Sequence, residues 1–138
     1  MSDEVRKLVH DLGKIPPELK RALRPGLRTA GRIVAEDAQA RASWSTRIPA
    51  AIKVRVGLTG RSAGVSVVVN RKVAPHARPF EHGGRDGTFR HPVYGHRKTW
   101  VAQRARPFLA PALEAKGDAA ERQIAEAVDK ATRAAGFR

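Results

Sequence analysis

Four histidines fall close together in the middle of the chain and raise the question of a metal site: His76, His82, His91 and His96. A zinc-binding pair on a helix is spaced by about four residues and is completed by a third ligand, commonly a carboxylate or a thiolate. Here the gaps are six, nine and five residues, across a glycine-rich stretch. His76 and His82 with Glu81 form the one combination whose spacing permits a site. Hydrogen bonding within a loop or an interface is the alternative, and we expect no metal and no other cofactor.

Catalytic motifs give no better support for an enzyme. The sequence contains no His-Glu-x-x-His and no phosphate-binding loop. No Gly-x-Ser-x-Gly elbow joins a strand to a helix, since G-R-S-A-G at 60–64 lies in the linker between two predicted strands. It has no cysteine, which excludes disulfides, thiolate ligands and a cysteine nucleophile. Glu81 and Asp86 form no evident acid and base pair, and a nuclease that used His91 or His96 as its base would need an acidic cluster to hold its metal. We therefore expect a protein without catalytic activity.

Positive charge is concentrated in the middle of the chain. The net charge of +14 divides into +2 for residues 1–37, +12 for residues 38–113 and zero for residues 114–138. A disordered basic arm would lie at one end and would lack the Val and Ile that separate these charges. The pattern indicates a structured surface that meets phosphate or an acidic protein, or else a solvated basic face.

Aromatic residues are interleaved with these cations, as a nucleic-acid surface would require. Phe89, Tyr94 and Trp100 lie among Arg and Lys residues, which favours phosphate contact combined with base stacking. No sequence-specific binding motif accompanies them, so any such contact would be independent of base sequence. Core packing is the alternative interpretation for Phe80, Trp100 and Phe108.

Apolar spacing predicts the elements that must position these residues. A short amphipathic helix is expected at residues 3–14, and a second one from Pro16 and Pro17 to about Ser43, with a kink at Pro25. Alternation of period two around Val54 and Val67 then predicts an antiparallel hairpin whose Lys53 and Arg55 face solvent.

The remainder of the chain reads as a helical turn, more strand and a long helix. We expect the turn at residues 77–81, a glycine-rich basic loop at 83–98, strands near 88–94 and 99–103, and a helix from Pro107 to near Gly136. The predicted fold is a single α+β domain over residues 1–138. Its helical N-terminal part is residues 1–43, its sheet part residues 50–104 and its C-terminal helix residues 105–136. One face of a small antiparallel sheet of about four strands is covered by the long N-terminal and C-terminal helices.

The composition also bears on solubility and assembly. No apolar run approaches the roughly 20 residues of a membrane-spanning helix, so we expect a soluble protein with no membrane contact. Aromatic residues make up only 5% of the chain, so its core must be built from Ala, Val, Leu and Ile. Contacts between subunits would supplement the modest stability of such a core.

Two stretches resemble the neck proteins of long-tailed double-stranded DNA phages and prophages, a family called tail-completion, head-tail joining or minor tail proteins. A-P-H-A-R-P-F-E-H-G at 74–83 is similar to that family's A-P-x-A-x-x-x-E-x-G turn, and A-R-P-F-L-A-P-A-L-E at 105–114 is similar to its R-P-F-x-x-P-A-L helix start. H-P-V-Y-G-H-R-K-T-W at 91–100 resembles the version in phages of actinobacteria. W-S-T-R-I-P-A-A-I at 44–52 departs from the family's P-x-x-T-G-x-L-x-x-S-I stretch, which leaves the position within the neck open.

The resemblance implies a virion protein, made in the host cytoplasm, that forms a ring of six copies between the head and the tail. Its implied partners are copies of itself and the neighbouring connector or stopper and tail-tube proteins, with non-specific contact to packaged DNA as an additional expectation. The alternative is a free, sequence-independent DNA-binding protein. We expect residues 83–98 to form a projecting arm that engages an adjacent ring or subunit, through Arg85, Phe89, Arg90, His91, Tyr94, His96, Arg97 and Lys98. A structural clamp at its base is expected from Pro79, Phe80, Glu81, Pro107, Phe108, Leu109 and Pro111.

Overall fold

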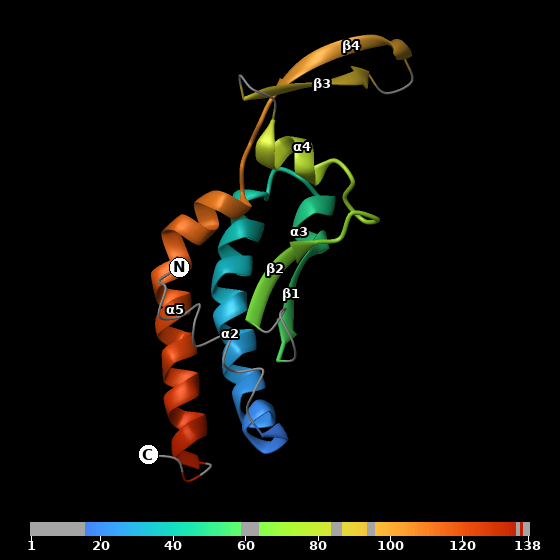
Figure 1. The fold of residues 1–138 in the computed structure, drawn as a ribbon. Helices are drawn as coiled ribbons and strands as arrows, with labels where there is room; N and C mark the ends of the chain where they lie inside the picture. Colours follow the sequence, from blue (N-terminus) through green and yellow to red (C-terminus); the bar gives the residue numbers. More distant parts are fainter. Residues whose placement is uncertain (1–15, 59–63, 84–86, 94–95, 135, 137–138) are drawn as a thin grey trace.

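The computed structural model describes residues 16–58, 64–83, 87–93, 96–134 and 136, with only the backbone of residues 91–93, 96 and 97. The helix predicted at residues 3–14 lies outside this part of the chain. The described elements follow in the order α2 (Pro17–Arg41), α3 (Arg47–Ala51), β1 (Ile52–Gly57), β2 (Gly64–Val69), α4 (Ala77–His82), β3 (Thr88–Val93), β4 (His96–Arg104) and α5 (Leu109–Ala134). The predicted α+β class is confirmed, with one long helix on each side of the strands in sequence (Figure 1).

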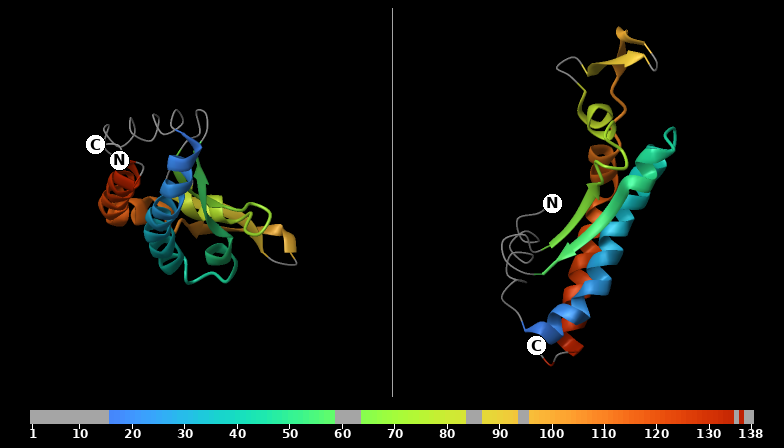
Figure 2. Two further views of the ribbon diagram at one scale, coloured as in Figure 1. Left: turned by 90° about the horizontal axis from the view of Figure 1, so that it is seen from below. Right: turned by 90° about the vertical axis from the view of Figure 1, so that its right-hand side faces the viewer.

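Helix α2 is the centre of the molecule. Pro17 occupies its first turn, where a missing N–H costs no hydrogen bond, and the helix continues through Pro25. Its buried residues recur every three or four positions, as predicted: Leu19, Leu23, Leu27, Ala30, Gly31, Val34, Ala35 and Ala38. Viewed from one end, α5, α2 and the β1–β2 hairpin follow one another as three layers (Figure 2, left).

Two glycines of α2 allow these layers to approach closely. A Cβ atom on Gly26 would collide with Ala127 of α5, and one on Gly31 would collide with Val54 of β1 and come within 2.7 Å of the Val65 Cγ1. The two positions are about 140° apart around the helix axis. Helix α2 therefore lies between the sheet and α5. The expectation that both long helices cover the sheet is wrong, because α5 packs chiefly along α2.

The β1–β2 hairpin has the predicted antiparallel pairing and the predicted faces. Val54 pairs with Val67 and Val56 with Val65, so their side chains share the face that packs on α2. Lys53 and Arg55 are exposed on the other face. The alternation of apolar and polar side chains predicts this hairpin correctly because one of its faces is covered and the other is not.

Strands β3 and β4 pair with each other and not with the first hairpin, so the single sheet of about four strands is wrong. The described residues form two separate two-stranded sheets, and α4 lies between them (Figure 1). The physical reason is that the described residues of β3 and β4 carry charged or polar side chains on both faces, including Arg90, Lys98 and Gln103. Such a hairpin offers no continuous apolar face to pack on α2.

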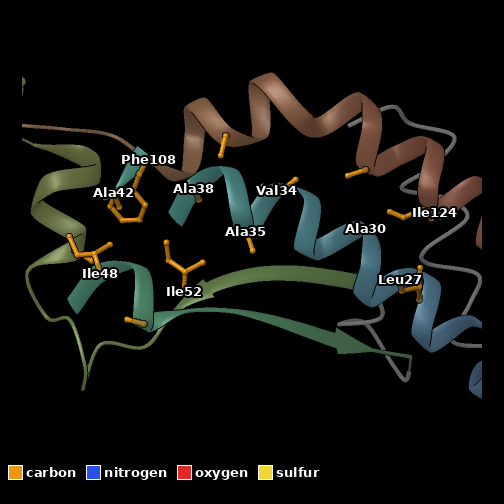
Figure 3. Packing of buried hydrophobic residues seen from close by; sticks show 14 of the residues in the cluster. Leu27, Ala30, Val34, Ala35, Ala38, Ala42, Ile48, Ile52, Phe108 and Ile124 are labelled. Carbon is orange, nitrogen blue, oxygen red and sulfur yellow. The ribbon is translucent and has the colours of Figure 1, made fainter. Parts of the chain in front are cut away.

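The core is made largely of small aliphatic residues, as the composition predicts. Its largest fully buried side chains are Phe108, Leu23, Leu27 and Ile48. Figure 3 shows Phe108 beside Ala42, and Ile52 beside Ala35, so the core joins the start of α5 to the far end of α2. Among the described residues, no helix is both long enough and apolar enough to cross a bilayer.

Candidate interaction site: the arm and its junction with the body

The hairpin of β3 and β4, here called the arm, projects from one end of the remaining elements (Figures 1 and 2). Helices α2, α3 and α5 with strands β1 and β2 are called the body. The arm meets the body through α4 and residues 105–110, here called the junction. The arm and the junction contain almost all of the residues that the sequence assigns to partner contact or to a clamp.

The backbone N–H groups at the start of α5 need hydrogen-bond acceptors from outside the helix. The first four N–H groups of a helix have no partner within the helix. At α5 these would belong to residues 108–111, but Pro111 has no N–H, and Ala112 donates the first intrahelical bond, to the Phe108 carbonyl at 3.4 Å. Phe108 is fully buried, which limits access of water to its amide. Three N–H groups therefore require an acceptor from elsewhere in the protein.

The carboxylate of Glu81 supplies all three acceptors. Its Oε2 accepts from the N–H groups of Phe108 at 2.7 Å and Leu109 at 2.9 Å, and its Oε1 accepts from Ala110 at 2.8 Å. Glu81 is 9% exposed and is the buried charged residue of the described chain. Negative charge also complements the positive end of the helix dipole of α5. Glu81 thus caps α5 from a separate helix, α4.

Backbone hydrogen bonds attach the arm to the same place. The Arg106 N–H donates to the Phe80 carbonyl at 2.8 Å, and the Ala105 N–H donates to the Gly87 carbonyl at 2.7 Å. Gly83 has φ +61°, and a Cβ atom there would lie 2.9 Å from the Ala105 Cβ. A residue with a side chain would be strained at this position both by its backbone angle and by this approach.

Aromatic rings fill the inner side of the junction. The Phe80 ring centroid lies 4.5 Å from that of Trp44 and 4.9 Å from that of Phe89, and His76 approaches Phe80 edge-on at 6.2 Å. The guanidinium carbon of Arg106 lies 4.5 Å from the centre of the Trp44 ring. Contacts of this kind stabilise by about 0.5–1.5 kcal/mol each beyond the burial of area. They join the end of α2, the helix α4, the strand β3 and the segment before α5.

The two faces of the arm differ in what they meet. Phe89 pairs with Gln103, and Phe89 turns towards Phe80 at the junction. Arg90 pairs with Ala102, so alternation along the regularly paired part of β4 puts Trp100, Ala102 and Arg104 on the same face as Arg90. Lys98 lies where the register of β4 shifts, opposite Pro92 and Val93. The four residues that share this face are exposed, and Trp100 is 51% exposed. This set is called the outer face of the arm. Core packing of Trp100, one of the two interpretations of the sequence, is therefore wrong, whereas Phe108 does lie in the core.

The residues of the expected clamp meet at the junction. Phe80 and Glu81 contact the other elements as described, and the Pro79 carbonyl accepts from the Gly83 N–H at 2.7 Å. Pro107 precedes the buried Phe108, and Leu109 and Pro111 form the first turn of α5. Trp44 and Arg106 belong to the same cluster and were not assigned to it from the sequence. A tryptophan directly after a long amphipathic helix was the signal that could have found Trp44.

The expected partner-contact residues are placed less uniformly. Arg90 lies on the outer face and Lys98 is exposed at the register shift of β4, while Phe89 packs on Phe80 and so contributes to attachment of the arm. His91, His96 and Arg97 are known as backbone positions of β3 and β4. Arg85 and Tyr94 lie outside the described residues.

His76 and Glu81, which the sequence suggested as possible metal ligands together with His82, make other contacts in the structure. Both carboxylate oxygens of Glu81 already accept hydrogen bonds from α5, and His76 packs on Phe80. Within the described ranges, no cluster of three or more His, Cys, Asp or Glu residues is placed to hold a metal ion.

Comparison with known proteins provides no relative from which a function could be transferred. No protein-family model, curated protein or solved structure matches this chain at a significant level.

Proposed function

We propose that the protein is a structural assembly subunit without catalytic activity, which forms a ring at the neck of a long-tailed phage and joins the DNA-filled head to the tail. The proposal combines the resemblance of residues 74–83 and 105–114 to neck proteins with the arrangement of those two stretches. They meet at the junction, where Glu81 of the first accepts hydrogen bonds from Phe108 of the second. This single contact is the main structural support for the proposal, because it holds both stretches together at the junction from which the arm projects.

A projecting arm on a rigid base suits a protein that must engage neighbours. The arm has little contact with the body beyond the junction, and its outer face remains exposed. An exposed hairpin of this kind gains its stabilising contacts from another chain. The body has mostly Ala, Val, Leu and Ile in its core, so burial of further area between subunits would add to its stability.

The copy number, the partners and the location follow from the resemblance and belong to the proposal. We propose six copies in a closed ring, contacts to a connector or stopper protein on one side and to a tail-tube protein on the other, and a place in the virion. Closed rings arise when one surface of a subunit binds a different surface of the next and the rotation closes.

Native mass spectrometry of the purified full chain tests the ring. A discrete oligomer of six copies is expected at micromolar concentration, and an unchanging monomer contradicts the proposal. Replacement of residues 88–104 by two glycines in the phage or prophage that encodes the chain tests the role. Filled heads and free tails are expected, and normal infectious particles would contradict the role of the arm. A reading frame located between a portal or capsid gene and a tail-tube gene would support the proposal independently.

A second candidate function rests on the outer face itself. Arg90 and Arg104 lie on the same face as the exposed Trp100, and this combination suits phosphate contact with base stacking. A free DNA-binding protein would bind duplex DNA with an affinity that falls steeply as salt is added. A neck subunit is expected to bind such DNA weakly when alone, so a salt titration of DNA binding separates the two candidates.

A further inference from the structure

A groove in the body has the features of a docking site for a protein segment. It has a volume of about 440 Å³ and lies between α2 and α5, with Val65 of β2 at one side. Small residues form much of its lining, including Ala30, Gly31, Gly117 and Ala120, and their lack of side-chain volume leaves the hollow. Leu113 lies at the groove and is 55% exposed. The volume falls within the roughly 300–1,000 Å³ of sites that enclose a bound group.

The charge at this groove is opposite to that of the chain. Glu114, Asp118 and Glu121 line it, in a protein with 27 Lys and Arg against 13 Asp and Glu. All three belong to α5, on the side that faces the hollow. An apolar floor with an acidic rim favours an occupant that presents an apolar side chain surrounded by cations.

The outer face of the arm presents that combination. Trp100 is its large exposed apolar side chain, and Arg90 and Arg104 lie on the same face. Tryptophan and arginine are the residues most enriched at the energetically dominant centres of protein interfaces. The groove and the outer face are thus complementary in both polarity and charge.

The arm of one chain is not placed to reach its own groove. Its base is held to the junction by the Arg106 to Phe80 hydrogen bond and by the contact of Phe89 with Phe80. From there the arm extends away from the layer of α2 and α5 (Figure 1). Docking within one chain would break these contacts, whereas docking on a second chain would retain them.

We propose that the outer face of the arm docks into the α2–α5 groove of a second copy of this chain, with Trp100 in the groove and Arg90 and Arg104 against its acidic rim. This rests on the self-assembly proposed above and names the two surfaces that carry it. Because the surfaces differ, the contact is head to tail, and each copy offers a free arm and a free groove until a ring closes.

Disulfide trapping tests the contact directly, because the chain has no cysteine of its own. Ala102→Cys lies beside Trp100 on the outer face, and Leu113→Cys lies at the groove. Full-length chains with one substitution each, distinguished by a size tag, are mixed in a glutathione redox buffer. The mixed disulfide dimer is expected at least tenfold in excess over that formed between Ala102→Cys and Ser66→Cys, which is exposed on the other side of the sheet. Adding Trp100→Ala to the arm variant is expected to remove that excess.

A charge exchange separates this contact from a general effect on folding. Arg104→Glu is expected to weaken self-association on the order of tenfold by sedimentation, and Glu114→Arg in the same chain is expected to restore most of it. Both residues are exposed, so at a dilution where all the chains are monomeric each single variant is expected to unfold at the temperature of the unsubstituted chain.

Four results would overturn the proposal. If the chain self-associates without preference for the Ala102 and Leu113 pair, the proposed contact is wrong and the proposed assembly function is retained. If the chain stays monomeric at 100 µM and low salt, both the proposed contact and the proposed assembly function are wrong. Loss of 20-base-pair duplex binding by tenfold or more in Trp100→Ala, without any change in self-association, assigns the outer face to nucleic acid. A disulfide within one chain between Val9→Cys and Leu113→Cys assigns the groove to the chain's own N-terminal segment, whose sequence predicts an apolar helix face.

Discussion

Glu81 and Phe108 are 27 positions apart in the sequence, and the Glu81 carboxylate accepts the Phe108 N–H at 2.7 Å. The same carboxylate serves the next two amides, so one side chain completes the start of α5. Glu81→Ala would leave three N–H groups at a largely buried helix start without an acceptor. We expect its free energy of unfolding in urea to fall by about 2–4 kcal/mol.

Two further variants identify the cause of that loss. Glu81→Gln keeps one acceptor oxygen but turns an NH₂ group towards amide donors, so an intermediate loss is expected. Glu114→Gln removes an exposed charge near the same end of α5, and a change within about 0.5 kcal/mol is expected. An unfolding midpoint of Glu81→Ala equal to that of the unsubstituted chain would show that Glu81 is not the cap.

Two glycines in helices provide a matched pair for the packing of the layers. In the interior of α5, a Cβ atom on Gly117 would meet only the Leu113 Cδ1, at 3.8 Å, so Gly117→Ala should stabilise by about 0.5–1 kcal/mol. Gly31→Ala would gain the same helix propensity but would push α2 away from Val54 and Val65. A net loss of about 1–2 kcal/mol is expected, because overpacking outweighs propensity. Thermal unfolding of both variants checks the opposite signs, and equal signs would contradict the close approach of α2 to the sheet.

The sequence predicts those parts of the fold that depend on local periodicity. The buried residues of α2 recur every three or four positions, and apolar residues alternate in steps of two along the β1–β2 hairpin. Each pattern arises because one face of the element is covered, and it therefore identifies the element from the sequence. The helical turn expected at residues 77–81 corresponds to α4. It too depends on local sequence, because the prolines at this point restrict the backbone. The expected α+β class follows from these local elements.

What the sequence does not predict depends on contacts between distant residues. Whether β3 and β4 join the first sheet depends both on an apolar face, which they lack, and on α4, which lies between the two hairpins (Figure 1). Tryptophan is a residue type common in protein cores, yet Trp100 is 51% exposed on the arm. Glu81 was expected in a clamp, but its particular role depends on Pro111, which removes the fourth N–H and leaves three for one carboxylate to accept.

The aromatic cluster of the junction is expected to control the mobility of the arm. Phe80→Leu would remove the ring contacts with Trp44 and Phe89 while leaving an apolar side chain in place. We expect the amides of Ala105 and Arg106, which tie the base of the arm, to exchange about five- to tenfold faster with solvent. Hydrogen exchange resolved by NMR measures this. Arg78→Gln, exposed on the same helix, is the control, and equal exchange in both variants would exclude a role of the rings.

The arm is expected to be dispensable for folding of the body. Its base closes where the Ala105 N–H donates to the Gly87 carbonyl at 2.7 Å, so replacement of residues 88–104 by two glycines can rejoin the chain without strain. The variant loses the Phe89 contact with Phe80 but keeps Glu81 on the start of α5, so its free energy of unfolding should fall by only about 1 kcal/mol. Circular dichroism during thermal unfolding checks this, and sedimentation of the same sample should show a monomer. A body that fails to fold without the arm would show that the hairpin is part of the core, whereas a folded variant that still forms rings would show that assembly uses other surfaces.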